Sequence, residues 1–226
     1  MPELPEVETI KTTMQSLIGD RITHISVMNP NLRWPVPVHE LNQHICSARI
    51  ERVWRRSKYL ILDMDSRYSL FIHLGMSGRL GRFRADNPLE DHSHVVFNLE
   101  SGWQIRYRDP RRFGFLDVVY TRKLEHHPRF NKLGVEPLAL DFSPDYLGTA
   151  ALRSRRSIKT LIMDANIVVG IGNIYANEAL FRARVRPEKA SNRLTRSEIA
   201  DLVSAIKEIL NDAIRCGGTT LLDFRN

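Results

Sequence analysis

The residues best suited to covalent chemistry stand at the start of the chain, where residues 1–6 read MPELPE. Removal of Met1 would make Pro2 the amino terminus, and a terminal proline is a secondary amine, a nucleophile that no internal residue supplies. An α-amino group titrates near ~8 and a lysine near ~10.4, so more of the terminal amine is unprotonated at neutral pH. Such an amine could form an iminium with a sugar C1′, and Glu3 could protonate the opening sugar ring as a general acid.

The same stretch also has the features of an ordinary helix start. Pro5 suits the first helical position, and Glu6 suits the positive end of the helix dipole. Apolar residues then recur at helical spacing from Val7 to Ile18, and Gly19 follows as a stop signal. Taken alone, these residues favour the helix start over a catalytic amine.

The next part of the chain predicts strands that would position such a site. Seven short stretches are rich in β-branched and aromatic residues and are bounded by turn residues, which is typical of strands. They span residues 21–29, 48–53, 59–63, 68–74, 94–99, 103–108 and 115–120. Seven or more strands of this length favour a sandwich or a barrel.

A change of composition after the strands predicts a second part of an α+β chain. From about Leu124 the sequence is rich in Pro, His and Gly with weak periodicity, which indicates a linker. Helical patterns follow, and the last has one apolar stripe, a capping box of Thr195 and Glu198, and Gly217 at its end. The four patterns span residues 144–151, 157–164, 173–184 and 196–216. We expect a β domain at residues 1–130, a linker at 131–150 and a helical domain at 151–226.

Composition limits the class of protein. The 226 residues are 42% hydrophobic, which is enough for real cores in one large domain or two small ones. Lys and Arg number 33 against 26 Asp and Glu, and this excess favours a polyanionic partner. No apolar run approaches the ~20 residues that span a bilayer, and the start is unlike a signal peptide, so we expect no membrane association and a cytoplasmic location.

Three predicted turns hold residues that could contact DNA. Lys58 follows two arginines at the start of a strand, where a cation could orient a sugar phosphate, although most such lysines are simply solvated. The turn at residues 109–114 holds two arginines and Phe113, whose ring could enter a base stack as a wedge or could tuck into the core. The Gly-Ile-Gly turn at 170–172 leads into a helix whose first N–H groups could bind phosphate, or it only connects elements.

Six ordered motifs cover the chain from end to end. They are PELPEVET at 2–9, RRSKYL at 55–60, HLGMSG at 73–78, DPRRFG at 109–114, GIGNIY at 170–175 and GGTTL at 217–221. In this order and spacing the chain resembles the formamidopyrimidine-DNA glycosylases, bacterial enzymes that remove oxidised purines from DNA. The resemblance implies an amino-terminal β-sandwich flanked by the first helix, followed by an all-helical helix-two-turns-helix domain that binds DNA.

The resemblance also implies catalytic roles. Pro2 would attack C1′ of the damaged nucleotide and form a Schiff base, with Glu3 as proton donor and Glu6 as support for the amine. Lys58 would help proton transfer during the β-elimination that cleaves the strand. These roles describe a bifunctional DNA glycosylase and AP lyase that excises 8-oxoguanine and formamidopyrimidines.

Other residues would contact DNA. By resemblance, Met76, Arg111 and Phe113 fill the hole left by the flipped nucleotide, which must leave the stack because C1′ cannot be attacked inside a duplex. The predicted DNA contacts are His73, His92, Arg111, Arg155, Lys159, Asn173 and Tyr175. The basic run around Arg155 could also be only a solvated face, and the loop of His92 mere surface. The expected partner is double-stranded DNA with oxidised purines or abasic sites, bound by a monomer at the nucleoid.

The resemblance breaks at the carboxyl end. Relatives normally carry a lesion-capping loop and a zinc ribbon with four cysteines, whereas this chain has only Cys46 and Cys216. These two thiols lie far apart and indicate buried reduced cysteines. We therefore expect no cofactor in this chain, where full-length relatives hold one Zn²⁺, and we expect weak DNA binding with inefficient δ-elimination. Both a fragment of a longer protein and a naturally short form fit this ending.

Two other functions stay open. If Met1 is retained, the nitrogen of Pro2 is an amide without nucleophilicity, and the chain would be a DNA-binding protein on the same scaffold. A glycosylase for oxidised pyrimidines is the second alternative, although PELPEVET resembles the purine-specific branch more closely.

Overall fold

The computed structural model describes residues 2–218, which form two compact units. Residues 7–127 with Pro2 form the first unit, and residues 3–6 with the chain from Pro128 onward form the second. The first helix, α1 (Leu4–Met14), is therefore divided between the two units at Val7. The last residues of the predicted helical domain and of the GGTTL motif, 219–226, lie outside the described residues, as does Met1.

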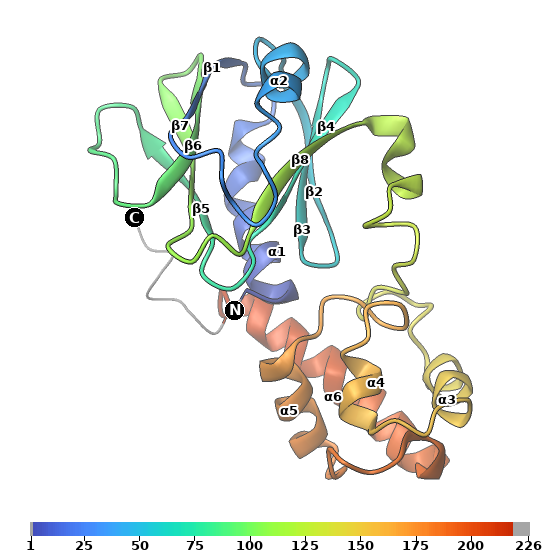
Figure 1. Cartoon of the computed structure of the whole chain (residues 1–226). Coiled ribbons are helices and arrows are strands. Elements are labelled where there is room, and N and C mark those ends of the chain that lie inside the picture. The colour runs from blue at the N-terminus through green and yellow to red at the C-terminus, as the bar shows by residue number, and fades with distance from the viewer. Residues whose placement is uncertain (1, 219–226) are drawn as a thin grey trace. The chain divides into compact units, whose positions relative to one another are not determined.

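The first unit is a sandwich of two antiparallel four-stranded sheets (Figure 1). One sheet has the order β1-β6-β7-β5, with bounds Ile22–Val27, Ser93–Leu99, Trp103–Arg108 and Arg79–Arg84. The other has the order β2-β3-β4-β8, with bounds Ile50–Arg56, Tyr59–Met64, Tyr68–His73 and Phe115–Tyr120. The prediction of an α+β chain with an amino-terminal sandwich is confirmed.

One apolar core joins the two sheets and the part of α1 that belongs to this unit. Val7, Ile10 and Met14 lie on the inward face of α1 at helical spacing and pack with side chains from both sheets. Short helical segments complete the unit. They are η1 (Gln15–Leu17), α2 (Val38–Glu40), η2 (Leu41–Ile45) and η3 (Thr121–His126).

Strand β5 is the strand that the sequence patterns missed. It reads RLGRFR and lies at the edge of its sheet, paired only with β7. An edge strand with three arginines among six residues has no apolar run to reveal it, and such charges also discourage pairing with other chains. The helical segment at Val38–Ile45 was also not predicted.

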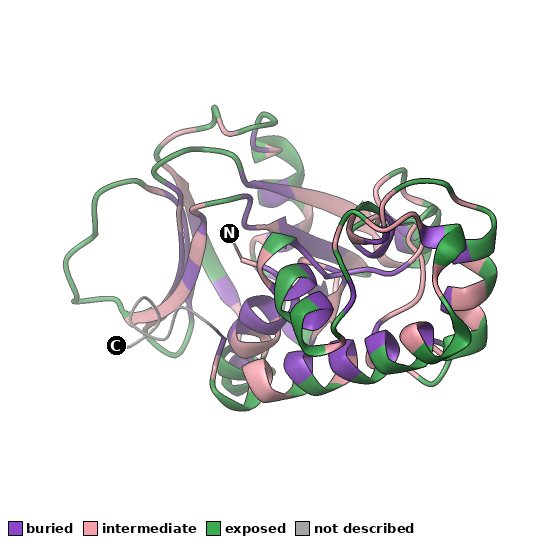
Figure 2. Ribbon diagram, turned by 90° about the horizontal axis from the view of Figure 1, so that it is seen from below, coloured by how far each residue is buried: buried purple, intermediate pink, exposed green. Residues whose placement is uncertain are grey.

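The second unit is helical in the described residues that follow η3. Its helices are α3 (Pro144–Leu152), α4 (Ile158–Ile162), α5 (Asn173–Arg182), η4 (Ser191–Arg193) and α6 (Arg196–Arg215). The capping box predicted for Thr195 and Glu198 is present, and the apolar stripe of α6 packs into the core of this unit. Figure 2 shows that the helices of this unit are buried on one side and exposed on the other.

The boundary between the units falls between His127 and Pro128. Helix α3 begins inside the range expected to be a linker and packs against α6 in the helical unit. Within residues 2–218, no helix is long and apolar enough to cross a membrane.

Candidate functional site

The carboxylate of Glu3 is held at the start of α5. The backbone N–H of Gly172 donates to Glu3 Oε2 at 2.6 Å, and that of Ile174 donates to Oε1 at 3.0 Å. The side chain is buried, with 1% of its surface exposed. These N–H groups have no partner inside the helix, and the helix dipole adds positive potential, so the carboxylate is stabilised as an anion. The N–H of Gly172, in the Gly-Ile-Gly turn, therefore binds the carboxylate of Glu3.

Two glycines of this turn are required by close approach to the amino-terminal segment. A Cβ on Gly172 would lie 2.4 Å from the carboxyl carbon of Glu3. Gly170 has a φ of +82°, and a Cβ there would lie 2.8 Å from Cβ of Leu4, whose N–H donates to the carbonyl of Gly170 at 3.0 Å. Any side chain at either position would displace the segment that carries Pro2 and Glu3.

Glu6 holds the backbone beside Pro2. The N–H of Glu3 donates to Glu6 Oε2 at 2.8 Å, and the hydroxyl of Tyr175 donates to Glu6 Oε1 at 2.6 Å. Glu6 and Tyr175 are both buried. A Cβ on Gly218, which has a φ of +89°, would lie 2.9 Å from Glu6 Oε1. Charge-assisted bonds of this kind are about twice as strong as neutral ones, so Glu6 has a fixed orientation.

The two residues predicted to bind phosphate on α5 lie in different environments. Asn173 is exposed at the first position of the helix, where a phosphate ligand could be reached. Tyr175 is 1% exposed and its hydroxyl is bound to Glu6. A DNA contact by either residue stays a prediction, and the burial of Tyr175 favours an indirect role for it.

Lys58 lies in the two-residue turn that joins β2 to β3. Its neighbour Ser57 has a φ of 57°, and the carbonyl of Ser57 accepts a hydrogen bond from Arg55 Nη1 at 2.8 Å. Arg55 Nε also donates to Glu8 Oε2 at 2.8 Å, and Lys11 donates to the other oxygen of Glu8. Burial raises the pKa of Glu8, but the hydrogen bonds from Lys11 and Arg55 outweigh it and hold the pKa below its ordinary value. Glu8 therefore anchors the turn that presents Lys58.

Strand register brings Lys58 and His73 to the same end of their sheet. Tyr59, the first residue of β3, pairs with His73, the last residue of β4, and His73 pairs with Phe115, the first residue of β8. The ring of His73 stacks on Phe115 at 5.4 Å and lies 5.1 Å from the ring of Tyr59. His73 Nδ1 accepts the N–H of Gly75 at 3.1 Å, which leaves the ring proton of a neutral imidazole on Nε2.

The predicted wedge residues extend from two loops that begin at this same end. Met76 lies in the loop from β4 to β5, and Arg111 and Phe113 lie in the loop from β7 to β8. Met76 is 44% exposed and Phe113 is 40% exposed, and the guanidinium of Arg111 lies 4.7 Å from the centre of the Phe113 ring. A Cβ on Gly75 would lie 2.4 Å from the amide nitrogen of Gly114, so the two loops touch at their backbones.

Asp109 holds these two loops together. Its Oδ1 accepts the hydroxyl of Ser77 at 2.6 Å, and its Oδ2 accepts the N–H of Gly114 at 2.8 Å and the hydroxyl of Tyr107 at 3.2 Å. Asp109 is fully buried. Burial raises the pKa of Tyr107, and the charge of Asp109 raises it further, so this hydroxyl stays a donor. Sequence patterns gave no sign of this role, because its three partners lie in different loops and strands.

His92 lies close to the same loops. Its carbonyl accepts the N–H of Asp109 at 3.2 Å, and Nε2 of His94 donates to the carbonyl of Asp109 at 2.8 Å. The side chain of His92 is exposed. Six predicted residues therefore share one end of the sandwich: Lys58, His73, Met76, His92, Arg111 and Phe113.

Arg106 is a second residue that sequence patterns missed. It is buried and its guanidinium donates to the carbonyls of Pro88, Asn87 and Arg84 at 2.7, 2.6 and 3.2 Å. Burial lowers the pKa of Arg106, and the charge of Glu90 partly opposes that shift. The contacts with Asn87 and Pro88 order the loop between β5 and β6, which carries His92, and the third contact is with the last residue of β5. An alternating strand pattern predicts that a residue is buried but cannot show that a buried arginine binds a loop.

The predicted basic contacts of the helical unit lie around the start of α4. Arg155 is exposed in the loop before the helix, and Lys159 is half-buried in its first turn. The neighbouring Arg156 forms an ion pair with Asp164 at 2.8 Å, so this part of the basic run has a structural role. DNA contacts by Arg155 and Lys159 stay predictions.

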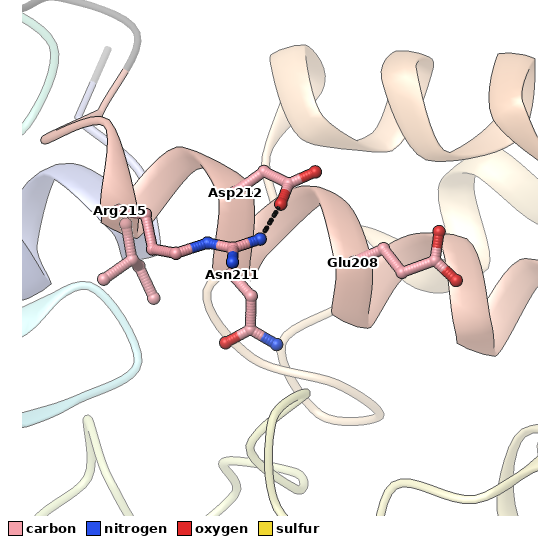
Figure 3. A pocket seen from close by; sticks show the side chains of 5 residues that line it. Glu208, Asn211, Asp212 and Arg215 are labelled. Carbon is pink, nitrogen blue, oxygen red and sulfur yellow. Dashed lines mark hydrogen bonds and ion pairs between the residues drawn. The ribbon is translucent and has the colours of Figure 1, made fainter.

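A hollow on α6 has the wrong charge for a phosphate site. Figure 3 shows Glu208 and Asp212 lining it together with Arg215, which donates to Asp212. The hydrogen bond from Arg215 lowers the pKa of Asp212. Arg182 bridges the same two carboxylates at 3.5 Å, so acidic and basic groups here satisfy one another.

The described residues offer no metal centre. In residues 2–218, no group of three or more His, Cys, Asp or Glu side chains is arranged to hold a metal ion. Cys46 is half-buried in the sandwich unit, and Cys216 is exposed at the end of α6. The expectation that both thiols are buried is therefore wrong for Cys216, which follows the last turn of its helix, and only half met by Cys46.

Comparisons with known proteins agree with this architecture. Residues 1–116 match the family model described as the formamidopyrimidine-DNA glycosylase N-terminal domain, and residues 133–225 match the formamidopyrimidine-DNA glycosylase H2TH domain. A formamidopyrimidine-DNA glycosylase of Thioalkalivibrio sulfidiphilus is 47% identical over 226 residues, covering 99% of this chain and 82% of that protein.

Solved structures of Lactococcus lactis Fpg are also similar. A complex with abasic-site DNA has a TM-score of 0.90 at 32% identity and covers 97% of this chain and 80% of that chain. A complex between a mutant of that enzyme and a Fapy-dG containing DNA has a TM-score of 0.91 at 32% identity, covering 97% and 81%.

Proposed function

Because the chain belongs to the formamidopyrimidine-DNA glycosylase family, a family of DNA-binding repair enzymes, we propose that it excises oxidised purines from double-stranded DNA and then cleaves the abasic site. The substrates would be 8-oxoguanine and formamidopyrimidines. The observation that carries this proposal is the fixed carboxylate of Glu3 directly beside Pro2. The DNA complexes of the Lactococcus lactis enzyme support damaged duplex DNA as the partner.

The proposed nucleophile is the secondary amine of Pro2 after removal of Met1. Attack of the neutral amine on C1′ forms a carbon–nitrogen bond, and the damaged base leaves with the electrons of the glycosidic bond. The nitrogen then carries a proton that Glu3, held as a carboxylate, can accept and pass to O4′ as the sugar ring opens. The product is an iminium between Pro2 and the sugar.

Strand cleavage follows from the type of amine. An iminium formed from a secondary amine has no nitrogen proton to lose, so it stays an electron sink and promotes β-elimination. The proposed role of Lys58 is to assist proton transfer in this step, from a turn that Glu8 and Arg55 anchor. His73 and Asn173 would contact phosphate near the lesion.

The proposed wedge is the group of Met76, Arg111 and Phe113. These side chains are exposed on loops whose backbones are tightly joined through Asp109, which supports a rigid probe of the base stack. Insertion would fill the space of the flipped nucleotide and offset part of the unstacking cost, which is a few kcal/mol per step. The further DNA contacts proposed are His92, Arg155 and Lys159.

The zinc ion of full-length relatives does not fit the donors described here. Cys46 and Cys216 belong to different units, and the described residues provide no cluster of ligands. We propose that this chain acts as a monomer on chromosomal DNA and that residues 2–218 hold no cofactor.

Borohydride trapping on an 8-oxoguanine duplex tests the proposal. The protein is analysed by intact mass, so that the state of Met1 and the adduct are read together. A covalent adduct on protein that lacks Met1 is expected. No adduct despite a free Pro2 would instead support a DNA-binding protein without catalysis, and a preference for thymine-glycol duplexes would support an oxidised-pyrimidine glycosylase.

A further inference from the structure

Tyr175 is the least expected member of the cluster around the amino terminus. A tyrosine that binds DNA needs an accessible hydroxyl, yet this side chain is 1% exposed and donates to Glu6 Oε1 at 2.6 Å. Glu6 in turn accepts the backbone N–H of Glu3 at 2.8 Å. The hydrogen bonds therefore run from Tyr175 through Glu6 to the peptide that joins Pro2 to Glu3.

We propose that Tyr175 is a positioning residue that fixes the direction of the Pro2 amine through Glu6. This inference rests on the proposed function. The N–H of Glu3 lies in the plane of the Pro2–Glu3 peptide, so holding that N–H holds the plane. The ring of proline is rigid, and only the ψ torsion of Pro2 then separates the fixed plane from the amine nitrogen. Once that torsion is also set, the lone pair of the Pro2 nitrogen points in one direction.

In this arrangement the first turn of α5 fixes both the side-chain carboxylate and the backbone N–H of Glu3. The N–H of Ile174 holds the carboxylate of Glu3, and the next residue, Tyr175, holds its backbone through Glu6. A site built on a helix is more rigid than a site on a loop, and proton transfer and nucleophilic attack both depend on sub-ångström placement. The nucleophile and the proton carrier thus share one rigid support.

The space around Glu6 leaves little room for another orientation. A Cβ on Gly218 would lie 2.9 Å from Glu6 Oε1, and Glu6 itself is 2% exposed. Loss of the tyrosine hydroxyl would leave Oε1 without that donor in a buried place. Glu6 would then be held by one donor fewer and would fix the N–H of Glu3 less firmly.

The test compares Tyr175→Phe with a matched control, Tyr146→Phe. Tyr146 belongs to the same unit, and its hydroxyl donates to the backbone carbonyl of Ile167 at 2.8 Å rather than to Glu6. Single-turnover borohydride trapping on an 8-oxoguanine duplex measures the covalent step. Titration with a duplex that carries a tetrahydrofuran abasic analogue measures DNA affinity.

The expected result for Tyr175→Phe is a trapping rate about 10-fold lower, with DNA affinity unchanged within about twofold. Tyr146→Phe should keep the wild-type rate. The inference is overturned if Tyr175→Phe traps at the wild-type rate, if its loss is confined to DNA affinity, or if Tyr146→Phe is slowed equally.

A double-mutant cycle with Glu6→Gln separates this pathway from a general loss of structure. If Tyr175 acts only through Glu6, the double variant should be no more than about twofold slower than Glu6→Gln alone. Additive losses would mean that Tyr175 acts elsewhere and would overturn the inference. Absence of an adduct from wild-type protein with a free Pro2 would overturn the proposed function and this inference with it, whereas a wild-type rate in Tyr175→Phe would overturn the inference alone.

Discussion

The carboxylate of Asp109 accepts the backbone N–H of Gly114 at 2.8 Å and so closes the loop that carries Arg111 and Phe113. The same side chain accepts the hydroxyl of Ser77 from the neighbouring loop. A buried carboxylate thereby joins the two loops, and it gives the exposed residues of the proposed wedge a fixed base.

Replacement of Asp109 should reveal this role. In Asp109→Asn the amide brings N–H donors toward groups that already donate, so we expect a loss of about 2–3 kcal/mol in unfolding free energy. Chemical denaturation measures it. Asp117→Asn is the control on β8, because Asp117 is half-exposed and accepts from the adjacent N–H of Val118, and it should cost less than about 1 kcal/mol. Equal losses in the two variants would contradict the role given to Asp109.

Replacement of Gly172 by alanine should lower activity because of the contact with Glu3, not because alanine changes the stability of a helix. In Gly172→Ala the new Cβ meets the carboxyl carbon of Glu3 at 2.4 Å, so Glu3 must leave its two amide donors. We expect borohydride trapping to fall at least about 100-fold, since two charge-assisted hydrogen bonds of about 1.5–3 kcal/mol each are lost.

The matched control for this prediction is Gly148→Ala. Gly148 lies inside α3, where an added Cβ would meet only Cδ1 of Ile199, at 3.7 Å. That variant should trap normally and gain about 0.5–1 kcal/mol of stability, because alanine favours a helix over glycine. Normal trapping by Gly172→Ala would refute the assignment of the glycine turn.

Loss of the wedge ring should affect excision from duplex DNA without affecting folding. Phe113 is 40% exposed, so Phe113→Ala removes little buried surface and should leave the melting temperature within a few degrees. Excision of 8-oxoguanine from a duplex should fall about 10-fold, while excision from a single strand should change little because no stack has to be opened. Phe181→Ala, at a ring that is 88% exposed on α5, is the control. A similar loss on both substrates would argue against a wedge.

Acid should weaken the support of the Lys58 turn. The pKa of Glu8 is below its ordinary value of 4.5 in the folded chain because hydrogen bonds from Lys11 and Arg55 outweigh the effect of burial. A depressed folded pKa contributes stability that is present above 4.5 and is lost as the pH falls through the folded value. We expect Glu8→Gln to remove about 2 kcal/mol at neutral pH and to flatten the fall in stability as the pH drops below 4.5. An unchanged pH profile of unfolding in Glu8→Gln would exclude this role.

The sandwich was predictable because most of its strands are short runs of β-branched and aromatic residues bounded by turn residues, and β3, β4 and β6 are buried along most of their length. The pattern failed at β5, where arginines on an edge strand remove the apolar signal. The capping box of α6 was predictable from Thr195 and Glu198 alone, since its two hydrogen bonds are local. Interactions between residues that are close in the sequence can be predicted from the sequence itself.

The candidate site was predictable in part for the same reason. Pro2 and Glu3 are identified by the chemistry of their own types, whereas Asp109 and Arg106 act through partners that only the folded strands bring near. The family motif suggested a DNA contact for Tyr175, but nothing in the sequence spacing of Tyr175 and Glu6 predicts the contact between them. The roles of residues that act through partners distant in the sequence can be found only in the three-dimensional structure.

The contact between Glu3 and Gly172 spans 169 residues of sequence, so its timing during synthesis is constrained. At about 5–20 residues per second, a ribosome needs roughly 8–34 s to make the intervening chain. Throughout that interval the start of α5 does not exist, and residues 3–6 have no helical unit to join. Removal of Met1 during this interval would therefore precede the fixing of Glu3 on the start of α5.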